Sequence, residues 1–171
     1  MGAIAGGMKI KLTHTRNSLP EKTRIEIVTV LQERLADSID LMMQAKQAHW
    51  NVKGPNFIAL HGLFDKVFTD TSSYVDGIAE RIVQLGGVAE GAIGVAAKRS
   101  CMPEYSLDIS RASKHIAELA HGIAFFSELV RKGVELCAQL GDVDTADILT
   151  EISRHADGNL WFVEAHEQAE H

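Results

Sequence analysis

The sequence predicts an all-α protein, a four-helix bundle in which one long crossover joins the second helix to the third. Four long segments place apolar residues three and four positions apart, which is the spacing of an amphipathic helix. The chain has only three prolines, and no stretch alternates β-branched and polar residues as a strand does. Its 171 residues suffice for one compact domain with a core of its own.

The first predicted helix covers about residues 21–52 and the second about residues 57–85. Pro20 is typical of a first helical turn, Gly54-Pro55 separates the two helices, and Gly86-Gly87 ends the second. Their apolar faces are formed by Val28, Leu31, Leu35, Ile39 and Met42 in the first helix, and by Leu60, Phe64, Val67, Ile78, Ile82 and Leu85 in the second.

The segment from Gly86 to Asp108 is long for a loop in a compact domain, and its glycines and Pro103 make it irregular. The second helix would be roughly 40–45 Å long at about 1.5 Å per residue, and a connection of this length can span that distance. The third helix can therefore begin beside the start of the second and run parallel to it.

The third helix is predicted over about residues 110–140 and is ended by Gly141. The fourth begins at Asp142 or Asp144, as its N-cap, and ends near His166. Their apolar stripes are Ile116, Leu119, Ile123, Phe126, Val130, Val134 and Cys137, and then Leu149, Ile152, Ala156, Leu160 and Val163. Bundles with one such long crossover include the ferritin-like folds.

Composition sets limits on compartment and partners. Cys101 and Cys137 form no disulfide framework, which indicates a reducing compartment. Residues 1–7 are too short for a signal sequence, and no apolar run has membrane-spanning length, so we expect a cytoplasmic protein without a membrane partner. The formal net charge of −6 does not favour nucleic-acid binding by the body of the protein but is compatible with attracting cations.

Four polar residues of the second predicted helix share one face: His61, Asp65, Asp76 and Glu80. Positions 61 and 65, and positions 76 and 80, are each four residues apart, and 65 and 76 are separated by almost three full turns. At about 100° per residue all four fall within roughly a 100° arc. This arc lies beside the apolar stripe, at the edge of the bundle, which is unusual for a monomer.

The two pairs are about 22 Å apart along the helix axis, so one chain cannot bring both to one metal ion. A two-fold axis near Asp70–Thr71 can bring both pairs to one metal ion, because it places the helix antiparallel to the same helix of a second chain. Positions 61 and 65 of one chain then face positions 76 and 80 of the other. Small residues near that crossing would allow close approach: Thr69, Ser72 and Ser73. This arrangement predicts two equivalent sites, each built by two chains.

His49 joins these residues, because an antiparallel hairpin of the first two helices places it near His61. Two imidazoles and three carboxylates suit Fe(II), Mn(II) or Zn(II) better than a thiolate-loving metal, and they leave positions open for an oxidant. The alternative is a solvated face, on which acids and histidines four residues apart are common. That alternative explains either pair alone, whereas the joint pattern and the dyad favour a metal site.

On these residues the chain resembles the Dps family, the DNA-protection-during-starvation proteins or mini-ferritins. The resemblance covers about Ser18 to Glu164, and the spacing of the five polar positions matches the family without a gap. The matching stretches are Gln47–Phe57 (QAHWNVKGPNF), His61 with Phe64-Asp65, Val75–Arg81 (VDGIAER) with Leu85-Gly86-Gly87, Thr145–Leu149 (TADIL) and Leu160-Trp161-Phe162.

The resemblance implies a ferritin-like fold and a homo-dodecameric shell with ferroxidase sites at its two-fold interfaces. It assigns His49, His61 and Asp65 of one chain, with Asp76 and Glu80 of the partner, as iron-binding and catalytic residues. It also implies oxidation of Fe(II), preferably with hydrogen peroxide rather than O₂, and storage of ferric oxide, which protects DNA from oxidative damage. Nothing in the sequence indicates a haem. Trp50 matches an aromatic near the family's site, although packing explains it as well.

Two further regions are candidate sites. Four acidic residues lie at the start of the fourth helix: Asp142, Asp144, Asp147 and Glu151. Helix capping and the helix dipole explain them, and the alternative is that they line a pore that conducts iron. Residues 1–19 contain no acid, and we expect a flexible basic tail ahead of a bundle domain at 20–171. Twelve copies of Lys9, Lys11 and Arg16 on one shell could act together as a non-specific DNA contact, but the acidic body would oppose it.

Three functions therefore compete. The first is an iron-oxidising and iron-storing cage, and the second is a nucleoid-binding structural protein whose metal site is secondary. The third is a small metal-binding bundle that forms no shell. A di-iron site within one subunit is disfavoured, because larger ferritins carry Glu-x-x-His on two helices and this chain has only Glu118-x-x-His121.

Overall fold

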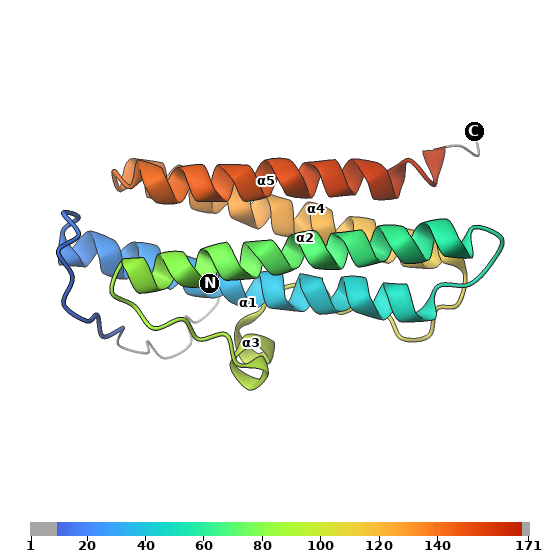
Figure 1. The fold of residues 1–171 in the computed structure, drawn as a ribbon, viewed down its shortest axis with the longest axis horizontal. Helices are drawn as coiled ribbons and strands as arrows, with labels where there is room; N and C mark the ends of the chain where they lie inside the picture. Colours follow the sequence, from blue (N-terminus) through green and yellow to red (C-terminus); the bar gives the residue numbers. More distant parts are fainter. Residues whose placement is uncertain (1–9, 169–171) are drawn as a thin grey trace, which may run out of the picture.

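Four long helices lie side by side along one axis in the computed structural model, which describes residues 10–168 (Figure 1). Their bounds, with those of one short helix, are α1 Glu21–Asn51, α2 Phe57–Gln84, α3 Ile93–Arg99, α4 Ala112–Gln139 and α5 Val143–Glu164. The predicted all-α bundle is confirmed, and each long helix begins and ends within a few residues of its expected position. None of the helices in the described part of the chain has the length and apolar character needed to cross a membrane.

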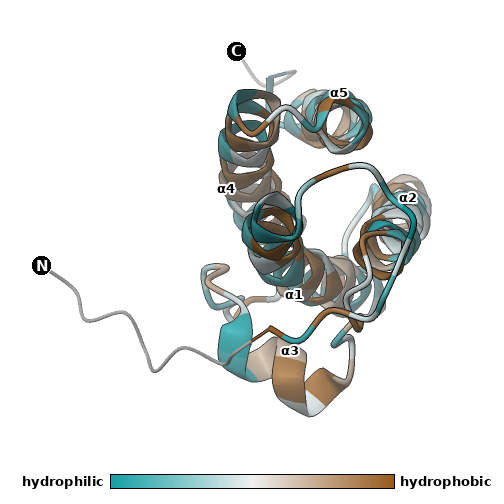
Figure 2. Cartoon of the chain, turned by 90° about the vertical axis from the view of Figure 1, so that its left-hand side faces the viewer, coloured by the Kyte–Doolittle hydropathy of each residue, from teal (hydrophilic) through white to brown (hydrophobic). Residues whose placement is uncertain are grey.

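The connection between α2 and α4 returns the chain along the whole bundle, as predicted. α1 packs against α2 and α4 packs against α5, and α4 begins at the same end of the bundle as α2 (Figure 1). The crossover is not wholly irregular, however, because α3 forms within it and lies on the outside of α1 (Figure 2). Only Ala96 of α3 is buried, so its apolar periodicity is too weak to stand out in the sequence.

The predicted apolar faces meet in the centre of the bundle, where the facing sides of the helices are hydrophobic (Figure 2). Phe64 and Phe126 are fully buried there. Of the residues assigned to the four stripes, only Met42, Val134 and Leu160 are half-buried rather than buried.

Residues 10–19 correct the prediction of a free tail. Thr13 donates from both its backbone N and its Oγ1 to the carbonyl of Gly86, at 2.7 and 3.0 Å. Gly86 has φ +90°, and a Cβ there would lie 2.7 Å from the carbonyl oxygen of Thr13, so only glycine fits this close approach. Ile10 and Leu12 also pack against the core. Lys9 lies outside the described residues.

A buried ion pair joins the end of α2 to the start of α5. Arg81 Nη2 lies 2.8 Å from Asp142 Oδ1, and Arg81 Nε donates to Thr145 Oγ1 at 2.8 Å. Asp142 Oδ1 also accepts from the backbone N of Thr145 at 3.0 Å, which confirms Asp142 as the N-cap of α5. Arg81 directly follows Glu80, so this contact fixes the part of α2 that carries two predicted ligands.

Candidate metal centre

Two imidazoles lie together where α1 ends and α2 begins. His49 Nδ1 is 2.8 Å from the carbonyl of His61, and His61 Nδ1 is 2.9 Å from the carbonyl of His49. Their rings stack with centroids 3.6 Å apart. Because a carbonyl only accepts, each Nδ1 carries the proton, and the lone pair of each Nε2 is left for a metal ion. The short 52–56 turn thus brings the two imidazoles against each other in a stacked pair.

Asp65 lies one helical turn beyond His61 and adds a carboxylate to this half of the site. Its Oδ1 is 3.9 Å from His49 Nδ1, and it accepts a hydrogen bond from Lys46, whose ammonium also lies 4.5 Å from the centre of the Phe68 ring. That hydrogen bond lowers the pKa of Asp65 below its usual range. The carboxylate is therefore ionised at neutral pH, as a metal ligand must be.

Asp76 and Glu80 are exposed on the same face of α2, toward its other end. They are four residues apart and about 22 Å along the helix from the 61/65 pair. Within residues 10–168, no group of three or more His, Cys, Asp or Glu side chains lies close enough to hold a metal ion in a single chain. His49, His61 and Asp65 lie within this range, so they form only a histidine half of the predicted ligand set, and Asp76 and Glu80 form a carboxylate half toward the other end of α2.

Comparison with known proteins identifies the family. The model of the ferritin-like domain matches residues 28–169. The DNA protection during starvation protein of Agrobacterium fabrum is 40% identical over 159 residues, which cover 93% of this chain and 98% of that protein. The chain belongs to the Dps family.

Solved Dps structures share the whole fold. DpsA14 from Streptomyces coelicolor matches with a TM-score of 0.87 at 32% identity, covering 92% of this chain and 93% of that one. Dps from Microbacterium arborescens, in a high iron form, matches with a TM-score of 0.81 at 28% identity, covering 88% and 97%. The resemblance first seen in the sequence is thereby confirmed at the level of family and fold.

Lys46 contacts the candidate ligands of this Dps chain, and the sequence reasoning did not single it out. It precedes His49 by three residues on α1 and so shares its face, which is a signal that the sequence did contain. Its ammonium is paired with the Asp65 carboxylate, so a metal ion bound by Asp65 would compete with Lys46.

Replacing Lys46 by Met should therefore strengthen divalent metal binding about fivefold at neutral pH, because it removes the weak, partly exposed ion pair that competes for the Asp65 carboxylate. The substitution also lets the pKa of Asp65 rise toward its ordinary value, so the benefit should shrink as the pH falls into the carboxylate range. Anaerobic calorimetric titration with Co(II) measures both effects. Lys46→Arg keeps the charge and should bind like the wild type; weaker binding by Lys46→Met would contradict the competition.

The acidic cluster at the start of α5 divides into one buried residue and three exposed ones. Asp142 is 3% exposed, and its carboxylate is held by Arg81 and Thr145, so it is not available to line a pore. The exposed members remain the pore candidates of this Dps subunit: Asp144, Asp147 and Glu151.

Other polar residues stay outside the site. His121 and Glu118 lie on α4, exposed and half-buried respectively, and form no cluster with a second motif of their kind. His115 is buried and its Nδ1 lies 2.7 Å from Tyr105 Oη, a contact that ties the end of the crossover to α4. Cys101 is an exposed free thiol and Cys137 a buried one. Burial raises the pKa of Cys137, and partial desolvation of the Cys101 thiol, together with the nearby Asp37, raises the pKa of Cys101.

Proposed function

We propose that this Dps protein oxidises Fe(II) at sites shared between two subunits and stores the ferric product inside a shell. The observation that carries the proposal is the reciprocal bonding of His49 and His61, which leaves both Nε2 atoms outside these hydrogen bonds while Asp65 Oδ1 lies 3.9 Å from His49 Nδ1. Such orientation by backbone carbonyls is the usual support of metal-ligating histidines. The high iron form of the Microbacterium arborescens relative supports iron as the metal.

A two-fold axis completes each site. Positions 61 and 80 have the same midpoint as positions 65 and 76, between Asp70 and Thr71, so one rotation matches both pairs at once. Near this midpoint the helix surface has a shallow hollow of about 470 Å³, lined by Thr69, Ser72 and Ser73 among others. Small side chains there allow two copies of α2 to approach each other closely.

The chemistry assigned to these residues is to bind Fe(II) and to receive its oxidant. Three carboxylates offset the charge of the iron, two imidazoles complete the binding set, and the remaining coordination positions stay open. Each hydrogen peroxide takes one electron from each of two Fe(II) ions and, with two protons, yields two water molecules. Consuming Fe(II) and peroxide together removes both reagents of hydroxyl-radical formation, which is how the protein would protect DNA.

The Asp76→Asn/Glu80→Gln variant tests the ferroxidase assignment. With both partner carboxylates neutralised, we expect Fe(II) oxidation after a substoichiometric hydrogen peroxide pulse to slow roughly a hundredfold. Ferric absorbance under anaerobic conditions gives the rate, and a parallel run with O₂ ranks the oxidants. Glu135→Gln removes an exposed carboxylate of α4 and should leave the rate unchanged. Equal, slow rates in all three proteins would overturn the proposal.

The proposed shell contains twelve copies of this 18.7 kDa chain and acts in the cytoplasm. A shell supplies the internal volume that storage requires, which a single bundle lacks. Sedimentation or native mass spectrometry should give a particle near twelve times the chain mass, whereas the bundle without a shell would give the mass of one or two chains.

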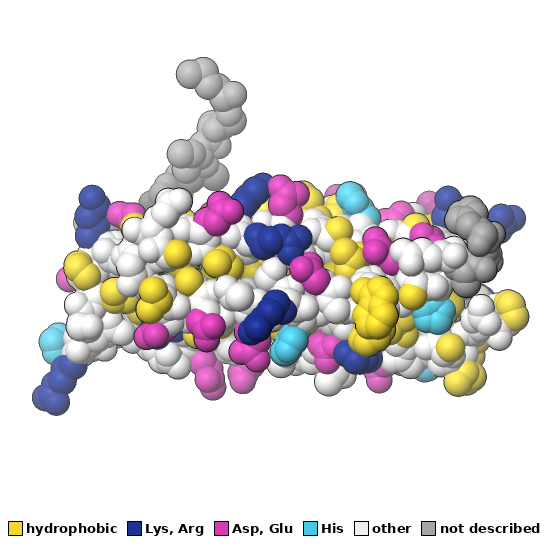
Figure 3. All heavy atoms as spheres, turned by 90° about the horizontal axis from the view of Figure 1, so that it is seen from above, with side chains coloured by type: hydrophobic (Ala, Val, Ile, Leu, Met, Phe, Trp, Pro, Cys, Tyr) yellow, Lys and Arg dark blue, Asp and Glu magenta, His cyan; other side chains and the backbone are white. Residues whose placement is uncertain are grey.

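Non-specific DNA binding is the second candidate function, and the exposed Lys11 and Arg16 in the N-terminal segment favour it. On the face seen in Figure 3, basic and acidic side chains are interspersed, so that face adds no basic stripe. Lys9→Gln/Lys11→Gln/Arg16→Gln keeps the Thr13 anchor and should abolish a DNA mobility shift that the wild type shows at low salt and loses as salt rises. A shift that survives in the variant would rule out this segment as the DNA contact.

A further inference from the structure

Two exposed apolar side chains bracket the polar residues of the α2 face. Ile58 is 78% exposed and precedes His61 by three residues, and Val83 is 57% exposed and follows Glu80 by three. At about 100° per residue, both fall within the same roughly 100° arc as the four ligands. In the isolated chain both apolar side chains lie in water, so burial of each against a partner surface would be favourable.

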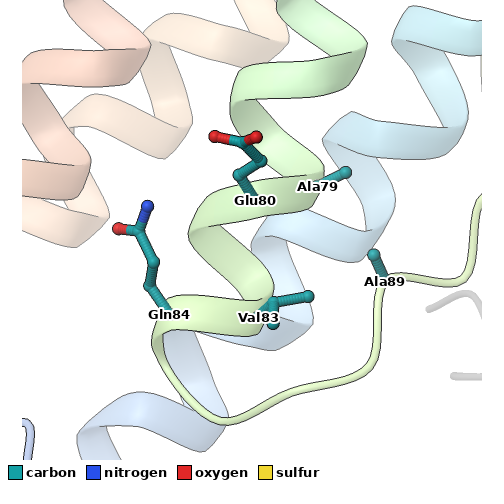
Figure 4. Close-up of a pocket in the computed structure, with 5 residues that line it drawn as sticks. All are labelled: Ala79, Glu80, Val83, Gln84 and Ala89. Carbon is teal, nitrogen blue, oxygen red and sulfur yellow. The ribbon is translucent and has the colours of Figure 1, made fainter.

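The surface around Val83 forms an apolar pocket of about 410 Å³ next to a predicted ligand. It is lined by Ala79, Glu80, Val83, Gln84 and Ala89. Figure 4 shows Ala79 and Val83 on the side of α2 that faces Ala89, whereas Glu80 and Gln84 extend on the other side. The pocket can therefore receive an apolar side chain without displacing the Glu80 carboxylate.

The symmetry that completes the metal site also selects the occupant of this pocket. Positions 58 and 83 have their midpoint between residues 70 and 71, the midpoint already shared by 61/80 and 65/76. Building on the proposed function, we infer that the partner's Ile58 fills the pocket at Val83, and that this contact closes the outer side of each shared metal site. Two such contacts form in each dimer because the operation is two-fold.

Two independent features favour a second copy of this chain as the occupant. The first is the charge at the interface: the carboxylate of Asp65 in the histidine half is paired with Lys46, so this half meets Asp76 and Glu80 under the same rotation without an unpaired like charge. The second is Gly62, where a Cβ would have no atom within 4 Å in the isolated chain, so nothing inside the subunit requires glycine. Position 62 pairs with Ala79 of the partner, and two such small residues allow the helices to approach.

The contact between Ile58 and Val83 would reduce the access of water to the metal site. An apolar wall beside carboxylate and imidazole ligands lowers the local dielectric and restricts solvent entry, which strengthens binding of the metal ion and limits exchange with chelators. Ile58 and Val83 thus shield the metal site from solvent and do not bind the metal ion themselves.

A cysteine pair tests the contact itself. In a Cys101→Ser background, Ile58→Cys/Val83→Cys should give a covalent dimer on treatment with a thiol oxidant such as diamide. Either cysteine alone should not, because equivalent positions of the two chains would lie about 37 Å apart. An intact shell without cross-linked dimer from the double variant would overturn the inference. Cross-linking together with an absent ferroxidase rate would instead overturn the proposed function and leave the contact standing.

A second measurement tests the effect on the metal. Ile58→Ala/Val83→Ala should lose bound Co(II) to an excess of chelator about tenfold faster than the wild type, followed by the Co(II) absorption spectrum. Ile93→Ala is the matched control, because Ile93 is 77% exposed on α3, away from this face, and its loss should leave the rate unchanged. An unchanged release rate in the double variant would show that these side chains do not close the site.

Discussion

Shells assembled from two different inactive subunits should recover about one quarter of the wild-type rate of Fe(II) oxidation. One subunit carries His49→Gln/His61→Gln and the other Asp76→Asn/Glu80→Gln. In a dimer of the two, one site combines the intact histidine half of one chain with the intact carboxylate half of the other. The second site combines both defective halves. Random pairing makes half of all dimers mixed, and half of the sites in those dimers are intact.

The control for this experiment uses two defects in the same half of the site. A mixture of His49→Gln and His61→Gln subunits should not recover activity, because both histidines of any site come from one chain. Native mass spectrometry verifies that the subunits have mixed. Failure of the first mixture, with mixed shells demonstrated, would contradict a site shared between subunits; recovery by the control mixture would contradict the assignment of both histidines to one chain.

The helices were predictable because their signals are local. Apolar residues at helical spacing, with Gly54-Pro55, Gly86-Gly87 and Gly141 as breaks, determined all four long helices to within a few residues. The crossover followed from its length alone. By contrast, α3 buries a single alanine, and the packing of residues 10–19 depends on Gly86, which is distant in sequence, so neither has a periodic local signal.

The candidate site was predictable for a related reason. His61, Asp65, Asp76 and Glu80 lie on one helix, so their common face follows from helical geometry, and the division of the site between two chains follows from its length. The reciprocal bonds of His49 and His61, by contrast, depend on how the 52–56 turn brings two helices together. Their assignment as iron ligands stays a prediction until the variants described above are measured.

The acidic residues at the start of α5 differ only in their tertiary contacts. Asp142 and Asp144 have the same residue type and nearly the same position, and the sequence alone left both as cap or pore residues. Only the tertiary structure brings Arg81, 61 positions away, against Asp142 and so removes one of them from the surface.

Replacing Arg81 by Met should lower the free energy of unfolding by about 3–5 kcal/mol, because it leaves the carboxylate of Asp142 buried without its cation. The side chains of the pair are only 8% and 2% exposed, so water cannot replace the lost partner. Denaturant unfolding at a fixed protein concentration measures the change, since assembly contributes to the apparent stability. The loss of this ion pair should also make the end of α2 more mobile. Glu80 would then be misplaced, and we expect slower Fe(II) oxidation.

Two controls separate the buried charge from the loss of any ion pair. Arg131 and Asp157 form a pair at 3.0 Å with side chains 51% and 52% exposed, so Arg131→Met should cost less than about 1 kcal/mol. Arg81→Met/Asp142→Asn removes the uncompensated charge but keeps a side-chain oxygen to cap α5, and it should recover part of the lost stability. If Arg81→Met cost no more than Arg131→Met, the Arg81–Asp142 pair would not be what holds α2 to α5. The position of Glu80 would then depend on the apolar contacts of Ile78 and Ile82 with the core.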